Sequence, residues 1–186
     1  TYDVTPLLQS GKNAVGIHLG NGWFNPYKKW WSWRMQWFGS KRTIMELHLR
    51  YADGSSEIVT TDDSWKAAAG PVTSACIYDG ETYDANLEQP GWDKPDFDDS
   101  HWENANIVIA PRGKLVSQTM QPIRVTETIK PVKLYTPSDG VYVFDMGQNF
   151  AGWSRLKVSG PKGTKINFRY AENKNDDGSL HTKSMN

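Results

Sequence analysis

Cysteine is almost absent from this chain of 186 residues, in which Cys76 is the only one. A single thiol cannot form an internal disulfide, so the fold is not a disulfide framework. The count leaves the cellular compartment open, because many exported proteins also carry no disulfides.

The chain also lacks an excess of charge and a long apolar run. Lys and Arg together number 21 and so do Asp and Glu, and no basic block stands out. A nucleic-acid binder needs a positive surface to capture phosphates, which excludes that class. No stretch of about 18 apolar residues is present, so we expect no membrane-spanning segment. The first residues are typical of folded sequence and not of a signal peptide.

Tryptophan, by contrast, is abundant: nine Trp residues help to raise the aromatic fraction to 12%. An aromatic face suits the C–H side of a sugar ring, which is typical of carbohydrate-binding proteins. The cores of β-sandwiches also use tryptophan, so composition alone leaves both interpretations open.

Short runs that alternate between apolar and polar residues, separated by turn residues, predict an all-β fold. Residues 43–51 and 56–60 are expected to form a hairpin through Ala52-Asp53-Gly54. Residues 153–158 and 164–171 flank a second turn, at residues 160–163. The other expected strands are residues 13–19, 72–78, 107–109, 123–127, 132–135 and 141–144. Two short helical turns are expected, at residues 5–8 and 98–102, and no segment has the apolar stripe of a long helix.

The regular pattern stops between Gly113 and Pro122, which predicts two units, residues 1–118 and residues 119–186. Both ends of the chain are expected to lie inside a domain, with further sequence on each side.

No hydrolytic machinery is recognised. Glycosidase chemistry needs two carboxylates that face each other across a cleft, and sequence alone cannot pair acids across a sheet. Cys76 has no evident histidine partner, and the four histidines lack metal-ligand spacing. No catalytic residue is assigned.

Three segments are candidates for binding. Leu19-Gly20-Asn21-Gly22-Trp23-Phe24-Asn25-Pro26 follows an expected strand, and its glycines allow close approach of a ligand to Asn21 and Trp23. The other interpretation of this segment is a tight turn with a packed Trp.

The second candidate is residues 79–86, where Asp79, Glu81 and Asp84 give an oxygen-rich segment. Such segments hold Ca²⁺ or accept sugar hydroxyls, but they are also typical of solvated turns. The third candidate is the aromatic cluster of Trp30, Trp31, Trp33, Trp37 and Phe38, which suits either sugar stacking or a contact between domains.

In order along the chain, these motifs resemble the N-terminal region of bacterial α-L-rhamnosidases of glycoside hydrolase family 78. The resemblance rests on many short motifs spread over nearly the whole chain. They include Leu19-Gly20-Asn21-Gly22-Trp23-Phe24, Asp63-Ser64-Trp65-Lys66, Gly80-Glu81-x-Tyr83-Asp84-Ala85, Phe97-Asp98-Asp99-Ser100-x-Trp102, Phe144-Asp145-x-Gly147-Gln148-Asn149 and Arg169-Tyr170-Ala171-Glu172.

The resemblance implies a galactose-binding-like jelly-roll sandwich over residues 1–118, followed by the start of a concanavalin-like β-sandwich over residues 119–186. In this family an (α/α)₆ barrel removes terminal α-L-rhamnose with inversion, and its acidic motif does not occur here. The chain is therefore expected to be a non-catalytic part of an extracellular or periplasmic enzyme, needing no cofactor. Its expected partners are a rhamnose-containing glycan and the barrel.

The resemblance also implies an alternative, a Ca²⁺-dependent rhamnose-binding module without a hydrolytic role. Asn21 and Pro26 match the spacing of an Asn and a Pro carbonyl that hold the ion in some relatives. Asn21, Trp23, Glu81 and Asp84 are the expected sugar-contacting residues. Relatives often read Tyr-Asp-Ala-Arg, whereas this chain has Asn86 in place of the Arg.

Overall fold

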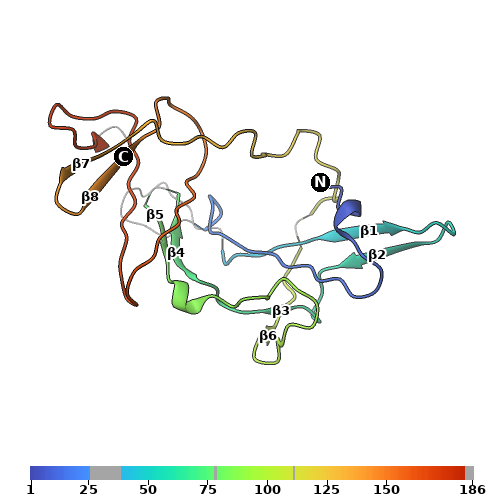
Figure 1. Cartoon of the computed structure of the whole chain (residues 1–186). Coiled ribbons are helices and arrows are strands. Elements are labelled where there is room, and N and C mark those ends of the chain that lie inside the picture. Colours follow the sequence, from blue (N-terminus) through green and yellow to red (C-terminus); the bar gives the residue numbers. More distant parts are fainter. Residues whose placement is uncertain (26–38, 78, 111, 183–186) are drawn as a thin grey trace. The chain divides into compact units, whose positions relative to one another are not determined.

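A computed structural model describes residues 1–25, 39–77, 79–110 and 112–182 (Figure 1). The predicted all-β class is confirmed: the regular elements of these residues are short antiparallel strand pairs and two single turns of 3₁₀ helix. No helix in these ranges is long and apolar enough to cross a membrane. The chain divides into two compact units, Thr1–Thr119 and Met120–Asn186.

The first unit contains three strand pairs. Strand β1 (Glu46–Arg50) pairs with β2 (Ser56–Thr60), β3 (Lys66–Ala67) pairs with β6 (Glu103–Asn104), and β4 (Val72–Cys76) pairs with β5 (Gly80–Tyr83). Two 3₁₀ turns, η1 (Thr5–Leu7) and η2 (Ala85–Leu87), join the extended segments.

The predicted hairpin of residues 43–60 is confirmed. Leu47 lies opposite Val59 and both are half-buried, whereas His48 on the other face is exposed, so the alternation sets the two faces. The expected turn at residues 5–8 also forms. At its start the Asp3 carboxylate accepts the backbone N–H of Thr5 at 3.0 Å.

The second unit contains β7 (Lys133–Ser138) and β8 (Val141–Asp145), which pair through a turn that includes Gly140, with φ of +72°. The Tyr135 hydroxyl donates to the carbonyl of Gly178 at 3.1 Å, which ties the loop of residues 173–181 to β7. Within that loop the Asn175 side chain bonds Ser179 and His181.

Five expected strands are wrong as hydrogen-bonded strands: residues 13–19, 107–109, 123–127, 153–158 and 164–171. These segments find no ladder partner among the described residues, and alternation alone does not supply one. Cys76 and Val143 are the only apolar side chains of the described part that are buried, because each strand pair is a single two-stranded ribbon with two faces.

Candidate functional site

The β4–β5 hairpin is one wall of the candidate site. Ala75 lies opposite Glu81 and Cys76 lies opposite Gly80, whose φ of +75° lets the chain reverse. A register shift between Val72 and Ser74 twists the hairpin at its far end. Residues 80–83, which the sequence suggested as part of an oxygen-rich loop, therefore form a strand.

Asn21 connects the segment before the hairpin to β4. Its side-chain nitrogen donates to the carbonyl of Ala75 at 2.8 Å, and the contact is part-buried. Because a carbonyl oxygen can only accept, the NH₂ end of the amide must face the strand, which fixes the orientation of the side chain. The carbonyl of Asn21 also accepts the N–H of Asn25 at 3.1 Å, so the segment turns directly after Asn21.

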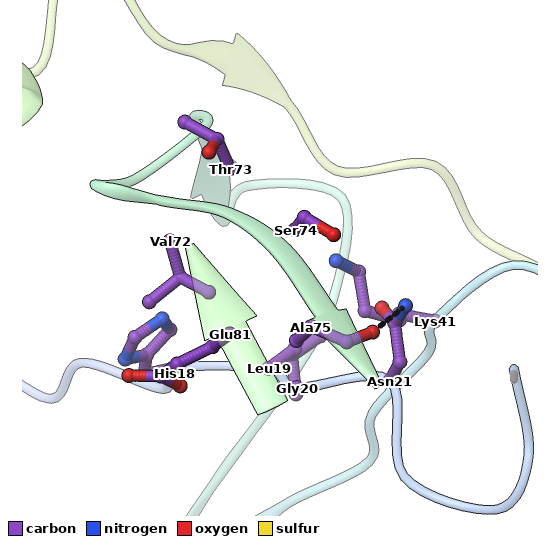
Figure 2. Close-up of a pocket in the computed structure, with 10 residues that line it drawn as sticks. All are labelled: His18, Leu19, Gly20, Asn21, Lys41, Val72, Thr73, Ser74, Ala75 and Glu81. Atoms are coloured by element: carbon purple, nitrogen blue, oxygen red, sulfur yellow. Dashed lines mark hydrogen bonds between the residues drawn. The ribbon is translucent and has the colours of Figure 1, made fainter. Parts of the chain in front are cut away.

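A hollow of about 320 Å³ lies between this segment and the hairpin. Its lining residues are His18, Leu19, Gly20, Asn21, Lys41, Val72, Thr73, Ser74, Ala75 and Glu81. In Figure 2 the His18 ring and the Glu81 carboxylate lie at one end, and Lys41 and Asn21 lie at the other.

This arrangement supplies an imidazole, an ammonium, a carboxylate and two hydroxyls around a small open volume. Such groups donate and accept hydrogen bonds with a neutral polar ligand. Among the described residues that line the hollow, Glu81 is the one carboxylate, whereas glycoside hydrolysis uses a facing pair.

The structure brings two of the four expected sugar-contacting residues, Asn21 and Glu81, to the same hollow. Trp23 lies outside the lining and is 68% exposed. Its ring therefore does not face the same volume as Asn21.

Asp84, the fourth expected residue, caps the 3₁₀ turn η2. Its carboxylate accepts the backbone N–H of Asn86 at 3.0 Å and the Asn86 side-chain nitrogen at 2.7 Å. These hydrogen bonds lower the pKa of Asp84 because they favour the charged carboxylate. In this chain Asn86 thus holds Asp84 in a local structural role.

Of the two expected calcium ligands, Asn21 is described and Pro26 lies outside the described residues. The aromatic cluster of residues 30–38, the third binding candidate, also lies outside them. Within the described ranges no group of three His, Cys, Asp or Glu side chains could hold a metal ion. Calcium binding stays a prediction.

Sequence reasoning missed His18 and Lys41 as lining residues. His18 lies next to the end of the expected strand of residues 13–19, three positions before Asn21, which is the only signal that could have identified it. Lys41 carries no pattern of its own, and it reaches the hollow only because the chain returns there before β1.

Comparison with known proteins agrees with the motifs. The family model of the α-L-rhamnosidase N-terminal domain matches residues 1–127, and the model of the bacterial α-L-rhamnosidase concanavalin-like domain matches residues 135–186. An α-L-rhamnosidase of Streptomyces avermitilis is 36% identical over 200 residues, covering 100% of this chain and 18% of the relative. One of Formosa agariphila is 36% identical over 169 residues, covering 89% of this chain and 18% of the relative.

Solved structures agree as well. The chain is similar to the S. avermitilis α-L-rhamnosidase complexed with L-rhamnose, with a TM-score of 0.68 and 42% identity over 74% of this chain and 13% of that chain. The α-L-rhamnosidase from Dictyoglumus thermophilum gives a TM-score of 0.60 and 43% identity over 74% of this chain and 16% of that chain. The chain spans about a fifth of the length of its curated relatives. The predicted resemblance is thus confirmed, and the chain belongs to the bacterial α-L-rhamnosidase family, matching its N-terminal and concanavalin-like domains.

Proposed function

We propose that this chain is a non-catalytic β-rich part of an inverting α-L-rhamnosidase that removes terminal α-L-rhamnose from glycans. Its role in that enzyme is to form a scaffold for the catalytic barrel and to add a recognition surface for the glycan. The matches to two non-barrel domain families, over about a fifth of the relatives' length, support this role.

The hollow between residues 18–21 and the β4–β5 hairpin is the observation that carries the proposal. Its described lining residues include one carboxylate, that of Glu81, whereas inversion needs an acid and a base on opposite faces of the sugar ring. Polar side chains around a single acid suit the hydrogen bonding of sugar hydroxyls and not hydrolysis. The jelly-roll topology of the first unit and a location outside the cytoplasm stay predictions from the resemblance.

An activity assay tests the division of roles. The purified chain is incubated with an aryl α-L-rhamnoside, alone and together with the separately produced barrel. We expect no release of the aryl alcohol by the chain alone and release when the barrel is present. Turnover by the chain alone, lost in Glu81→Gln, would contradict the proposal.

A second candidate function is Ca²⁺-dependent binding of rhamnose without a hydrolytic role. It is favoured by the fixed amide of Asn21 at the edge of the hollow and by the relative whose structure was solved with L-rhamnose. Calorimetry with rhamnose, with calcium and then with a chelator, separates the two candidates. Heat that disappears with the chelator supports the second, and absence of heat at millimolar sugar removes it.

A matched pair of variants locates any binding that is seen. Lys41→Met removes a charged group that lines the hollow, whereas Lys114→Met removes an exposed lysine that is not part of the lining. Weaker rhamnose binding in the first variant alone would place the sugar in the hollow. Equal binding in both would place the sugar elsewhere.

A further inference from the structure

Asn21 is followed by Gly22, and no other asparagine of the chain precedes a glycine. A backbone nitrogen can attack the side-chain carbonyl carbon of a preceding asparagine when no Cβ obstructs its approach. Glycine is the residue that lacks this obstruction. The sequence therefore singles out one of the chain's asparagines for this chemistry.

The surroundings of Gly22 leave space for the reaction. Its φ is +53°, and no heavy atom beyond its chain neighbours lies within 4 Å of the position that a Cβ would occupy. Asn21 itself is held more firmly, since its side-chain nitrogen donates to the Ala75 carbonyl at 2.8 Å in a part-buried contact. The nitrogen that would leave is thus the atom that anchors the segment to β4.

We propose that Asn21 is a site of spontaneous deamidation, and that its hydrogen bond to Ala75 controls the rate. The Gly22 nitrogen bonds to the side-chain carbonyl carbon of Asn21, the bond from that carbon to the side-chain nitrogen breaks, and ammonia leaves with the Gly22 proton. Water then opens the cyclic imide at either carbonyl and leaves aspartate or isoaspartate. The balance needs only water and no oxidant or reductant.

The product no longer fits the contact. At neutral pH a carboxylate has acceptors only, and it would face the Ala75 carbonyl, which is also an acceptor. Two facing acceptors repel, so the tether between the Asn21 segment and β4 is lost. The hollow also gains a second negative charge besides that of Glu81, beside the ammonium of Lys41. Deamidation therefore changes both the order and the charge of the hollow.

The kinetics are measured on the whole chain by peptide mapping after incubation at mildly alkaline pH, in buffer and in concentrated urea. The mass gain that accompanies replacement of NH₂ by OH is expected at Asn21 and not at Asn13 or Asn149, which precede Ala14 and Phe150 and serve as internal controls. We expect the reaction to be about tenfold slower in buffer than in urea, the factor that one hydrogen bond of typical net strength provides. Equal rates in both solutions, or reaction at the controls and not at Asn21, would overturn the proposal.

The consequence is measured by hydrogen exchange of the β4 amides in Asn21→Asp. Exchange at neutral pH is expected to be about tenfold faster than in the unsubstituted chain, for loss of the same hydrogen bond. Below about pH 3.9, the ordinary pKa of Asp, the protonated carboxyl regains a donor and protection should return to that of the unsubstituted chain at the same pH. Unchanged protection at neutral pH would show that the contact does not hold the segment and would overturn the consequence.

Discussion

Two segments of this chain have the same alternating pattern, but only one of them forms a ladder. Residues 43–60 form the β1–β2 hairpin, whereas residues 153–158 and 164–171 form no paired strands. Both have a glycine with a left-handed backbone at the turn, Gly54 with φ of +86° and Gly163 with φ of +85°. Pattern and glycine are therefore not sufficient.

The difference lies in where the turn places its glycine. In the first segment the N–H of Gly54 donates to the carbonyl of Tyr51, and the N–H of Tyr51 donates to the carbonyl of Ser55. Gly54 thus follows a type I turn as the third loop residue, an arrangement that continues the twist of two paired strands.

In the second segment Thr164 donates to the carbonyl of Pro161, so Gly163 occupies the third position of a four-residue turn. Lys162 does not have a positive φ, which makes this a type II turn. Type II turns splay the chains that enter and leave them. We infer that turn type, and not alternation, decides which segment pairs.

Swapping the sequences of the two turns should have the largest effect on strand pairing. The substitutions Pro161→Ala, Lys162→Asp and Thr164→Ser give the second segment the turn of the first. They should pair Val158 with Ile166 and Leu156 with Phe168, with a gain of about 2 kcal/mol for a few cross-strand pairs. Hydrogen exchange and cross-strand nuclear Overhauser effects would detect the new ladder.

The reverse exchange is the matched control: Ala52→Pro, Asp53→Lys and Ser55→Thr should open the β1–β2 hairpin. A β1–β2 hairpin that survives this change, with no new ladder in the second segment, would show that the turns do not decide the pairing.

Replacement of Gly54 by alanine should have the next largest effect. An L-residue with a left-handed backbone costs about 1 to 2 kcal/mol, so the β1–β2 amides should exchange faster in Gly54→Ala. Gly70→Ala is the control, because Gly70 does not have a positive φ and the position of its Cβ is open. There alanine should be neutral or slightly stabilising, since it restricts the unfolded chain. Similar losses in the two variants would remove the role given to the turn glycine.

The sequence predicted local strands better than contacts between distant segments. Strands β1–β2, β4 and β7–β8 formed near their expected positions, whereas the strands expected at residues 153–158 and 164–171, on either side of a glycine turn, did not form. Contacts between distant segments were not predictable, because the hydrogen bond from Asn21 to Ala75 depends on the path of the chain between these two residues. For the same reason Lys41 was missed. Asp84 accepts hydrogen bonds from Asn86 as the cap of η2, and its contact with a sugar stays a prediction.

A smaller effect is expected at the base of the β1–β2 turn. The Tyr51 hydroxyl donates to the Glu57 carboxylate at 2.8 Å, and this hydrogen bond raises the pKa of Tyr51 above 10.0. Because the folded pKa is raised, the contribution is present below the unfolded pKa and is lost as pH rises through the folded value. Glu57→Gln should lower the Tyr51 pKa towards its ordinary value in an absorbance titration, and an unchanged pKa would show that the contact is not made in solution.

The smallest effect is a pH dependence that distinguishes the two turns. The Asp53 carboxylate accepts the Ser55 N–H at 2.9 Å and its hydroxyl at 2.6 Å, and these bonds lower the pKa of Asp53 below 3.8. A lowered folded pKa means that the stabilisation is present above pH 3.8 and is lost as pH falls through the folded value. The turn of residues 161–164 contains no carboxylate, so hydrogen exchange of its amides should not change as pH falls through the folded pKa of Asp53.

Asp53→Asn keeps an acceptor but cannot titrate, and it should abolish the acid-induced loosening of β1–β2 seen by hydrogen exchange. Loosening that persists in this variant would assign the effect to another carboxylate.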